Sequence, residues 1–196
     1  MTKPNNIEQQ LLLSLAANSI RYGLLKGKLI SAMPSDYPEA ILQHHASFVT
    51  LEINHQLRGC IGTLQAHRTL VDDVNENAYS AAFRDPRFPP LSLEEFPLLD
   101  IHISILQPAK DMQVTDEADL LSQLRPGIDG LILQEGPHRA TFLPSVWESL
   151  STPEQFVSQL KLKAGLHRDY WSKTIHFQSY ETFSFAANIR EIDIDS

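Results

Sequence analysis

The stretch FVTLEINHQLRGCIG, residues Phe48–Gly62, decides the fold because its polarity alternates with a period of two. Val49, Leu51 and Ile53 are separated by polar residues, and after a polar Asn-His-Gln segment the alternation resumes as far as Ile61. Period-two alternation on both sides of a short polar segment is typical of a β-hairpin. The stretch therefore predicts two antiparallel strands with one apolar face.

The same pattern predicts a register for this hairpin. Large aliphatic residues gather on one face when the pairs are Ile53 with Leu57, Val49 with Ile61, Glu52 with Arg58, and Thr50 with Cys60. A slip of one residue would mix the two faces, so this register is favoured.

Outward from the hairpin, capping and breaker residues predict the remaining elements. They are a helix over 6–26 capped by Asn5, a helix from Thr69 to about 83, a strand over 99–105, a helix near 116–124, a hairpin over 130–143, a helix from Thr152 to about 165, and closing strand structure over 173–185.

The order hairpin, helix, strand occurs twice, at an offset of 82 residues such as that between Arg58 and Ala140. Residue identity across the offset is poor, so elements repeat rather than sequence. We expect an α+β fold in one domain, residues 1–196, with internal halves at approximately 46–110 and 128–190 that form two closely packed lobes.

Composition excludes several classes of function. The net charge of −8 and the isoelectric point near 5.4 argue against a nucleic-acid or anionic-membrane surface. A single cysteine, Cys60, excludes an internal disulfide and a multi-cysteine metal site, and it fits a reducing compartment. No apolar run is long enough for a membrane span, so a cytoplasmic location is expected. The eight histidines lack metal-site spacing, no metal site is predicted, and no cofactor is identified.

Cys60 lies in the most unusual stretch, between two glycines and two residues from Arg58. A guanidinium near the thiol would favour the thiolate, the nucleophilic form. The alternative is a small buried side chain, with the glycines allowing a helix to approach. A Cys–His pair stays open, because the histidine need not be near in sequence.

The loop Arg84–Pro90 is the second candidate. Arg87 could clamp an anion or a carboxylate, but Asp85 could equally pair with an arginine and fold the loop. Lys163, next to the apolar face of its helix, could point into a cleft, although solvent is the commoner direction for a lysine ammonium.

Six ordered motifs closely resemble the AMMECR domain family, the A component of the AmmeMemoRadiSam system. They are LRGCIG (57–62), AAFRDPRFPPL (81–91), LDIHISIL (99–106), GIDGLIL (127–133), TFLPSVWE (141–148) and LKAGLHRDYW (162–171). The resemblance covers nearly the whole chain.

The resemblance implies duplicated units forming two lobes around a largely antiparallel, barrel-like sheet. It further implies a cleft lined by Arg58, Gly59, Cys60 and Gly62 together with the loop Asp85–Phe88. As partners it implies a Memo-like protein and a radical S-adenosylmethionine enzyme. It does not define an activity.

Two functions are compatible with these residues and with the resemblance. In the first, Cys60 is reactive, Arg58 stabilises its thiolate or an anionic ligand, and Arg87 holds a substrate carboxylate or phosphate. In the second, the chain is a non-catalytic adaptor or a small-ligand-binding protein that uses the same cleft or an apolar patch. A homodimer is compatible with both.

Overall fold

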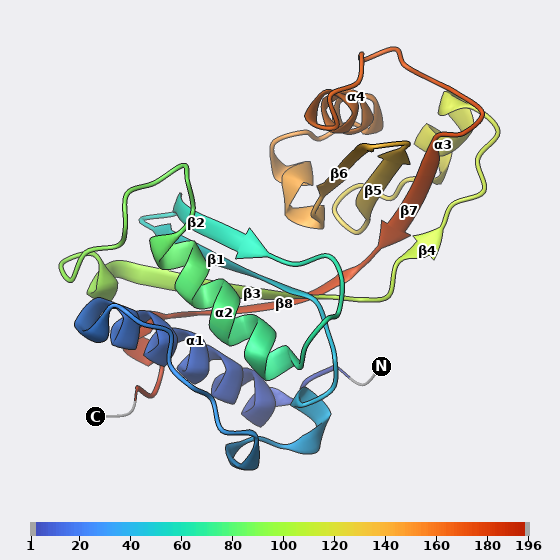
Figure 1. Ribbon diagram of the computed structural model, residues 1–196. Helices are drawn as coiled ribbons and strands as arrows, with labels where there is room; N and C mark the ends of the chain where they lie inside the picture. The colour runs from blue at the N-terminus through green and yellow to red at the C-terminus, as the bar shows by residue number, and fades with distance from the viewer. Residues whose placement is uncertain (1–2, 195–196) are drawn as a thin grey trace. The chain divides into compact units, whose positions relative to one another are not determined.

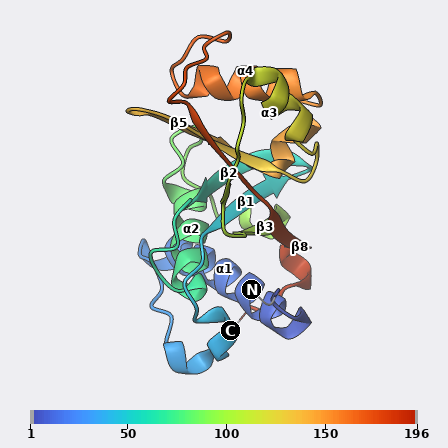
Figure 2. The ribbon, with the colours of Figure 1, turned by 90° about the vertical axis from the view of Figure 1, so that its right-hand side faces the viewer.

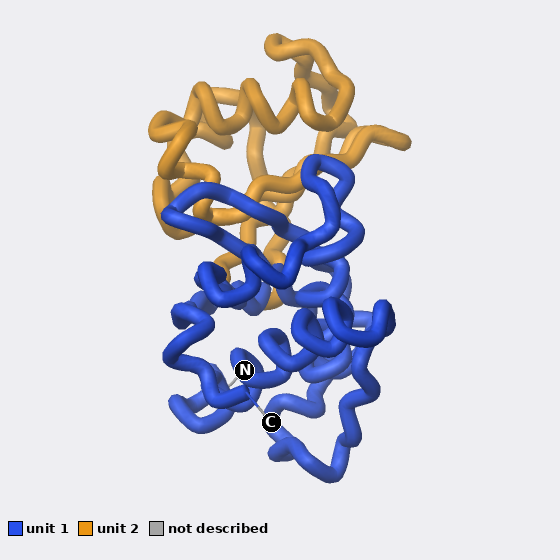
Figure 3. The backbone as a smooth tube through the Cα atoms, turned by 90° about the vertical axis from the view of Figure 1, so that its left-hand side faces the viewer, with its two compact units in different colours: residues 1–106, 183–196 blue, residues 107–182 orange. Residues whose placement is uncertain are grey.

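The computed structural model describes residues 3–194, and these residues form two compact units. Unit 1 takes in the described parts of residues 1–106 and 183–196, and unit 2 takes in residues 107–182 (Figure 3). Unit 2 is therefore one continuous segment, whereas unit 1 is completed by the end of the chain.

Unit 1 contains a four-stranded sheet with the order β2-β1-β3-β8. Its elements are α1 (Asn6–Lys26), β1 (Ser47–Ile53), β2 (Gln56–Gly62), α2 (Leu70–Phe83), β3 (Leu99–Leu106) and β8 (Thr182–Asn188), with short 3-10 helices at Pro34–Asp36, Glu39–Ile41, Phe96–Leu98 and Ile189–Glu191.

Unit 2 contains a second four-stranded sheet with the order β4-β7-β5-β6. Its elements are β4 (Lys110–Asp111), α3 (Glu117–Gln123), β5 (Gly130–Glu135), β6 (His138–Phe142), a 3-10 helix at Pro144–Glu148, α4 (Pro153–Lys163) and β7 (His176–Tyr180). Helix α4 packs against β6 and α3 packs beside α4 (Figure 2).

The two sheets share one plan, which confirms the predicted repeat of elements in an α+β fold. In each, the hairpin pairs through its first strand with the strand that follows the helix, giving β2-β1-β3 and β6-β5-β7. The fourth strands are exchanged: β3 runs on toward β4, which pairs with β7, and β7 runs on into β8, which pairs with β3. The last strand of the expected half 128–190 thus completes the first sheet. The expected barrel-like sheet is wrong, because each sheet is separate and ends on two edge strands.

Helix α1 begins and ends where the capping signals predict. The Asn5 side chain accepts hydrogen bonds from the amides of Ile7 and Glu8, and Glu8 accepts from the Asn5 amide. Gly27 ends the helix in the left-handed region with φ 66°. Within residues 3–194, no helix combines the length and apolar character that crossing a bilayer requires.

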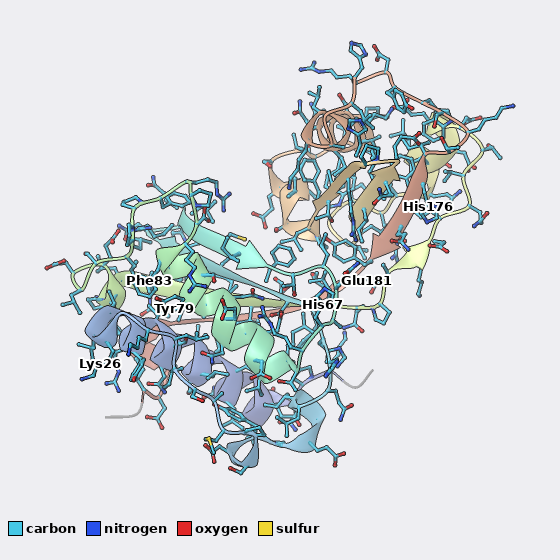
Figure 4. The ribbon with its side chains drawn as sticks, viewed as in Figure 1. Lys26, His67, Tyr79, Phe83, His176 and Glu181 are labelled. Carbon is cyan, nitrogen blue, oxygen red and sulfur yellow. The ribbon has the colours of Figure 1, made fainter. Side chains whose placement is uncertain are left out.

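The core of unit 1 lies between these helices and its sheet. Helices α1 and α2 run side by side along one face of the sheet (Figure 1). The rings of Tyr79 and Phe83 on α2 fill the space beside Gly23 of α1, so the two helices approach closely (Figure 4). Core residues of the helices and strands are fully buried, among them Leu12, Ile20, Val74, Val49, Leu51, Ile101 and Ile103.

The first hairpin corrects part of the predicted register. Asn54 and His55 have φ angles of 53° and 61°, so they form a two-residue turn that places Ile53 opposite Gln56 rather than Leu57. The register then shifts by one residue, with Glu52 opposite Leu57.

This bulge makes Arg58 the additional residue of β2, so the expected Glu52–Arg58 pairing is wrong. The bulge compensates for the one residue by which the turn is shorter than predicted. The two strands beyond the bulge therefore pair in the predicted register. The predicted pairs Thr50 with Cys60 and Val49 with Ile61 are confirmed.

Gly59 brings β2 against α2. It lies opposite Leu51, on the face that the helices cover, and a Cβ atom there would collide with the backbone carbonyl of Ala81. Backbone atoms cannot rotate aside as a side chain can, so this position accepts only glycine without a shift of strand or helix.

We predict that Gly59→Ala destabilises the fold. Separating β2 from α2 costs about 1–3 kcal/mol of unfolding free energy, as overpacking generally does. Urea denaturation followed by circular dichroism measures it. The matched control is Gln56→Ala at an exposed position of the same strand, which should change stability by less than about 0.5 kcal/mol. Equal stability of the two variants would contradict the predicted close approach.

Candidate functional site

Cys60 lies in a row of three side chains that crosses the middle of the first sheet. Thr50 on β1 is the pairing partner of both Cys60 on β2 and His102 on β3. Directly opposed residues project from the same face of a sheet. Leu51 and Ile101, next to Thr50 and His102, are buried on the helix side, so the row occupies the opposite face.

The thiol of Cys60 is half-buried and has one hydroxyl partner. The Thr50 hydroxyl donates to Sγ at 3.3 Å. His102 follows on the far side of Thr50, and its Nε2 lies 3.6 Å from Oε2 of Glu52. That separation is too long for a hydrogen bond but is short enough for an ion pair when the imidazole is protonated. A thiol, a hydroxyl and an imidazole thus share one face.

Asp85 fixes the backbone of Cys60. This carboxylate is buried just after the end of α2 and accepts from the Cys60 amide at 2.9 Å. It also accepts from Nε and Nη2 of Arg87 at 2.9 and 2.6 Å. The hydrogen bond from Arg87 is the main cause that lowers the pKa of Asp85 to about 2, and the Cys60 amide acts in the same direction.

Arg87 is held by Asp85, and about half of its side chain is exposed. Its pKa is raised, first by the hydrogen bond to Asp85, then by the charges of Asp85 and Cys60. Its Nη2 also donates to the Cys60 carbonyl at 3.2 Å. Of the two sequence alternatives for this loop, the internal ion pair is the one that forms.

Arg58, expected to stabilise the thiolate, forms its ion pair with Glu95. Its Nε and Nη2 donate to the two carboxylate oxygens of Glu95 at 2.7 and 3.0 Å, and Nη2 also donates to the Pro89 carbonyl. Phe88 lies beneath both guanidinium groups, with ring centroids 5.8 Å from Arg58 and 5.5 Å from Arg87. The two arginines therefore tie the loop to β2.

Sequence reasoning did not single out Glu95 or Thr50 as site residues. Glu95 accepts a hydrogen bond from the nearby Ser92 amide at 2.9 Å. Its ion pair with Arg58 joins residues 37 positions apart, which no local sequence signal indicates. Thr50 was paired with Cys60 in the predicted register, and that pairing was the available signal.

The two glycines beside Cys60 make room for protein atoms. The Cα of Gly59 faces the Ala81 carbonyl, and a Cβ at Gly62 would collide with the Phe48 ring. Lys163 belongs to unit 2, where its ammonium donates to the Thr141 carbonyl at 2.9 Å and lies 5.1 Å from the Phe142 ring centroid. Across residues 3–194, no three His, Cys, Asp or Glu side chains cluster as a metal site would require.

Comparisons with known proteins agree on one family. The sequence matches the AMMECR1 family over residues 13–185. A protein of Methanothermobacter thermautotrophicus is 39% identical over 150 residues, covering 74% of this chain and 76% of that protein. Protein MJ0810 of Methanocaldococcus jannaschii is 36% identical over 162 residues, or 79% of this chain and 78% of its own length. The crystal structure of uncharacterized protein PH0010 from Pyrococcus horikoshii aligns with a TM-score of 0.87 at 30% identity over 94% of both chains.

We predict that Asp85 makes stability fall in acid. Its folded pKa of about 2 lies below the unfolded value of about 3.9, so its contribution is complete above about pH 5 and is lost as the pH falls toward 2. The contribution at neutral pH is about 2 kcal/mol. Urea unfolding of the wild type and of Asp85→Asn between pH 2 and pH 7 measures it. The two curves should converge in acid, and a constant gap would contradict the assignment.

Proposed function

Because the chain belongs to the AMMECR1 family, we propose that it is the thiol-bearing component of a cytoplasmic system shared with a Memo-like protein and a radical S-adenosylmethionine enzyme. Cys60 is the group that reacts with or holds the substrate. The observation that supports this most is the cross-strand row of Cys60, Thr50 and His102 on the face away from the helices.

Each member of the row has a distinct role in this proposal. Cys60 is the nucleophile, and the Thr50 hydroxyl is a donor that a negatively charged sulfur accepts more strongly than a neutral one. The neutral His102 imidazole receives the thiol proton by way of the Thr50 hydroxyl, and Glu52, 3.6 Å from its Nε2, then stabilises the imidazolium that forms. The sequence offered Arg58 and Cys60 for catalysis, and the row adds Thr50 and His102 to the set.

Arg58 and Arg87 are positioning residues in this proposal. Glu95 and Asp85 neutralise their charges, so neither guanidinium is an open clamp for a substrate anion. Instead, Asp85 and Arg87 bind the amide and carbonyl of Cys60 and hold the thiol at a fixed place in the sheet. A small substrate is thereby met by the thiol and hydroxyl rather than by a cation.

The adaptor role has one observation in its favour. Arg58 of the LRGCIG segment and Arg87 of the RDPRF segment are paired with carboxylates, as they would be in a purely structural site. In that case the same face binds a partner protein and Cys60 serves as a small half-buried side chain.

We predict that His102 controls the reactivity of Cys60. In the wild type, iodoacetamide should alkylate the native protein rapidly at pH 7, because His102 receives the thiol proton. His102→Asn should slow labelling at pH 7 by roughly tenfold or more, and Thr50→Val should act in the same direction. The matched control is His55→Asn in the hairpin turn, which should label as the wild type does. Slow labelling with one transition near the free-thiol value of about 8.5 in all four proteins would overturn the nucleophile role.

The enzyme and adaptor roles separate in the Cys60→Ala variant. The thiol role predicts that this variant still folds and still co-purifies with a Memo-like protein or the radical enzyme, but loses the activity of the system. Retained activity in the folded variant would favour the adaptor. Near-ultraviolet circular dichroism checks that both proteins are folded.

A further inference from the structure

Two carboxylates face each other beside the row of Cys60, Thr50 and His102. Glu52 on β1 and Asp100 on β3 are direct pairing partners, two residues along their strands from the hydroxyl and the imidazole. Alternate residues of a strand project from the same face, so this carboxylate pair shares the outer face of the first sheet with the thiol. The spacing of residues and strands in a sheet places the Cα atoms of Glu52 and Cys60 roughly 8 Å apart. A small molecule at the thiol therefore lies within reach of the pair.

The contacts of the carboxylate pair leave its charge unbalanced. Oδ1 of Asp100 accepts from the neutral amide of Asn188 at 2.9 Å, and Glu52 has only the His102 imidazole, at 3.6 Å. Among residues 3–194, no lysine or arginine lies within ion-pair distance of either carboxylate. Both side chains are only partly exposed, so water screens them incompletely. Like charges at directly opposed positions destabilise a sheet, and a cation bound between them would relieve the repulsion.

The two arginines near the thiol do not offset this charge. Arg58 is balanced by Glu95, and Arg87 is balanced by Asp85. With the carboxylate pair and a neutral imidazole, two positive and four negative charges leave a net charge of −2 around the thiol. An anionic molecule is repelled by such a surface, whereas a cationic one is attracted to it.

The neighbouring strand leaves space next to the imidazole. Strand β8 borders β3, with Ser184 hydrogen-bonded to Ser104 at 2.9 Å and Asn188 bonded to Asp100. In the antiparallel register that these two contacts define, Ala186 lies beside the imidazole. Ala186 is exposed and offers only a methyl group. The cross-strand row therefore ends on a small side chain rather than on a bulky or charged one.

We propose that the substrate of Cys60 is a small organic cation whose ammonium group binds to Glu52 and Asp100, an inference that rests on the proposed thiol role and names its substrate class. An ammonium donates charge-assisted hydrogen bonds to carboxylates, which are stronger than those between neutral groups. A metal ion fits less well, because no three His, Cys, Asp or Glu side chains of residues 3–194 cluster as a metal site would require. Glu52 and Asp100 are thus specificity-determining residues.

Thiol reagents of similar size and opposite charge test this preference at pH 7 and constant ionic strength. The probes are 2-(trimethylammonium)ethyl and 2-sulfonatoethyl methanethiosulfonate. In each case the thiolate attacks the thiosulfonate sulfur, forms a mixed disulfide and releases methanesulfinate. After division by the rates for 2-mercaptoethanol, we expect the native protein to favour the cationic reagent by roughly tenfold or more. The ratio of the two rates cancels any change in the reactivity of the thiol itself.

The variants assign the preference to the carboxylate pair. Glu52→Gln and Asp100→Asn should each lower the ratio by about threefold or more, because each removes one nearby negative charge. The matched control is Glu39→Gln, which removes one exposed charge from the same unit outside the sheet and should keep the ratio of the wild type. An equal ratio in all four proteins would overturn the proposal.

A binding measurement reads the carboxylate pair without any reaction at the thiol. The ¹⁵N-labelled Cys60→Ala chain is titrated with propylammonium and, separately, with propionate. We expect saturable shifts of the amide signals of residues 50–52 and 100–102 with propylammonium alone, and their loss when Glu52→Gln and Asp100→Asn are combined. Linear shifts, or equal binding of propionate, would overturn the ammonium site. Slow labelling by both reagents together with saturable propylammonium binding would instead overturn the thiol role, so the two failures are distinguishable.

Discussion

The carboxylate of Asp85 is the contact on which the candidate thiol site depends. It is buried at the end of α2, yet it binds the amide of Cys60 in the middle of β2 and the guanidinium of Arg87 in its own loop. A buried charge is stable only when it is paired and hydrogen-bonded. Because both partners are supplied, one side chain joins helix, loop and strand. The place of the thiol in the sheet follows from that junction.

The two sheets share one arrangement of strands, but they carry different functional groups. The first sheet presents a thiol, a hydroxyl and an imidazole in register on its outer face. The second has a pocket lined in part by Gln107, whose buried amide nitrogen has no acceptor among residues 3–194. Phe142, rather than a second cysteine, stands at the 82-residue offset from Cys60. The shared plan is thus a scaffold on which each unit carries its own chemistry.

The sequence predicted the strands and their buried faces better than it predicted the hairpin turn and the long-range contacts between elements. Alternation in β1 and β3 is a local signal, so the buried aliphatic faces and the Thr50–Cys60 pair were readable. The two-residue turn was not: Asn54 and His55 both tolerate positive φ, but the bulge at Arg58 hides the effect of the turn on the register further along β2. Asp85 and Arg87 are close in sequence and their pairing was foreseen as an alternative. Arg58 and Glu95 are brought together only by the tertiary fold.

The exchange of fourth strands has a consequence for the order in which the protein is completed during synthesis. Unit 2 is one continuous segment and is fully available to fold once residue 182 has left the ribosome. The first sheet, although most of it is made earlier, keeps β3 as an unpaired edge until Thr182–Asn188 arrives. An exposed edge of that kind invites pairing with other chains. Unit 2 therefore acts as an insert whose length sets how long the nascent first sheet waits for its closing strand.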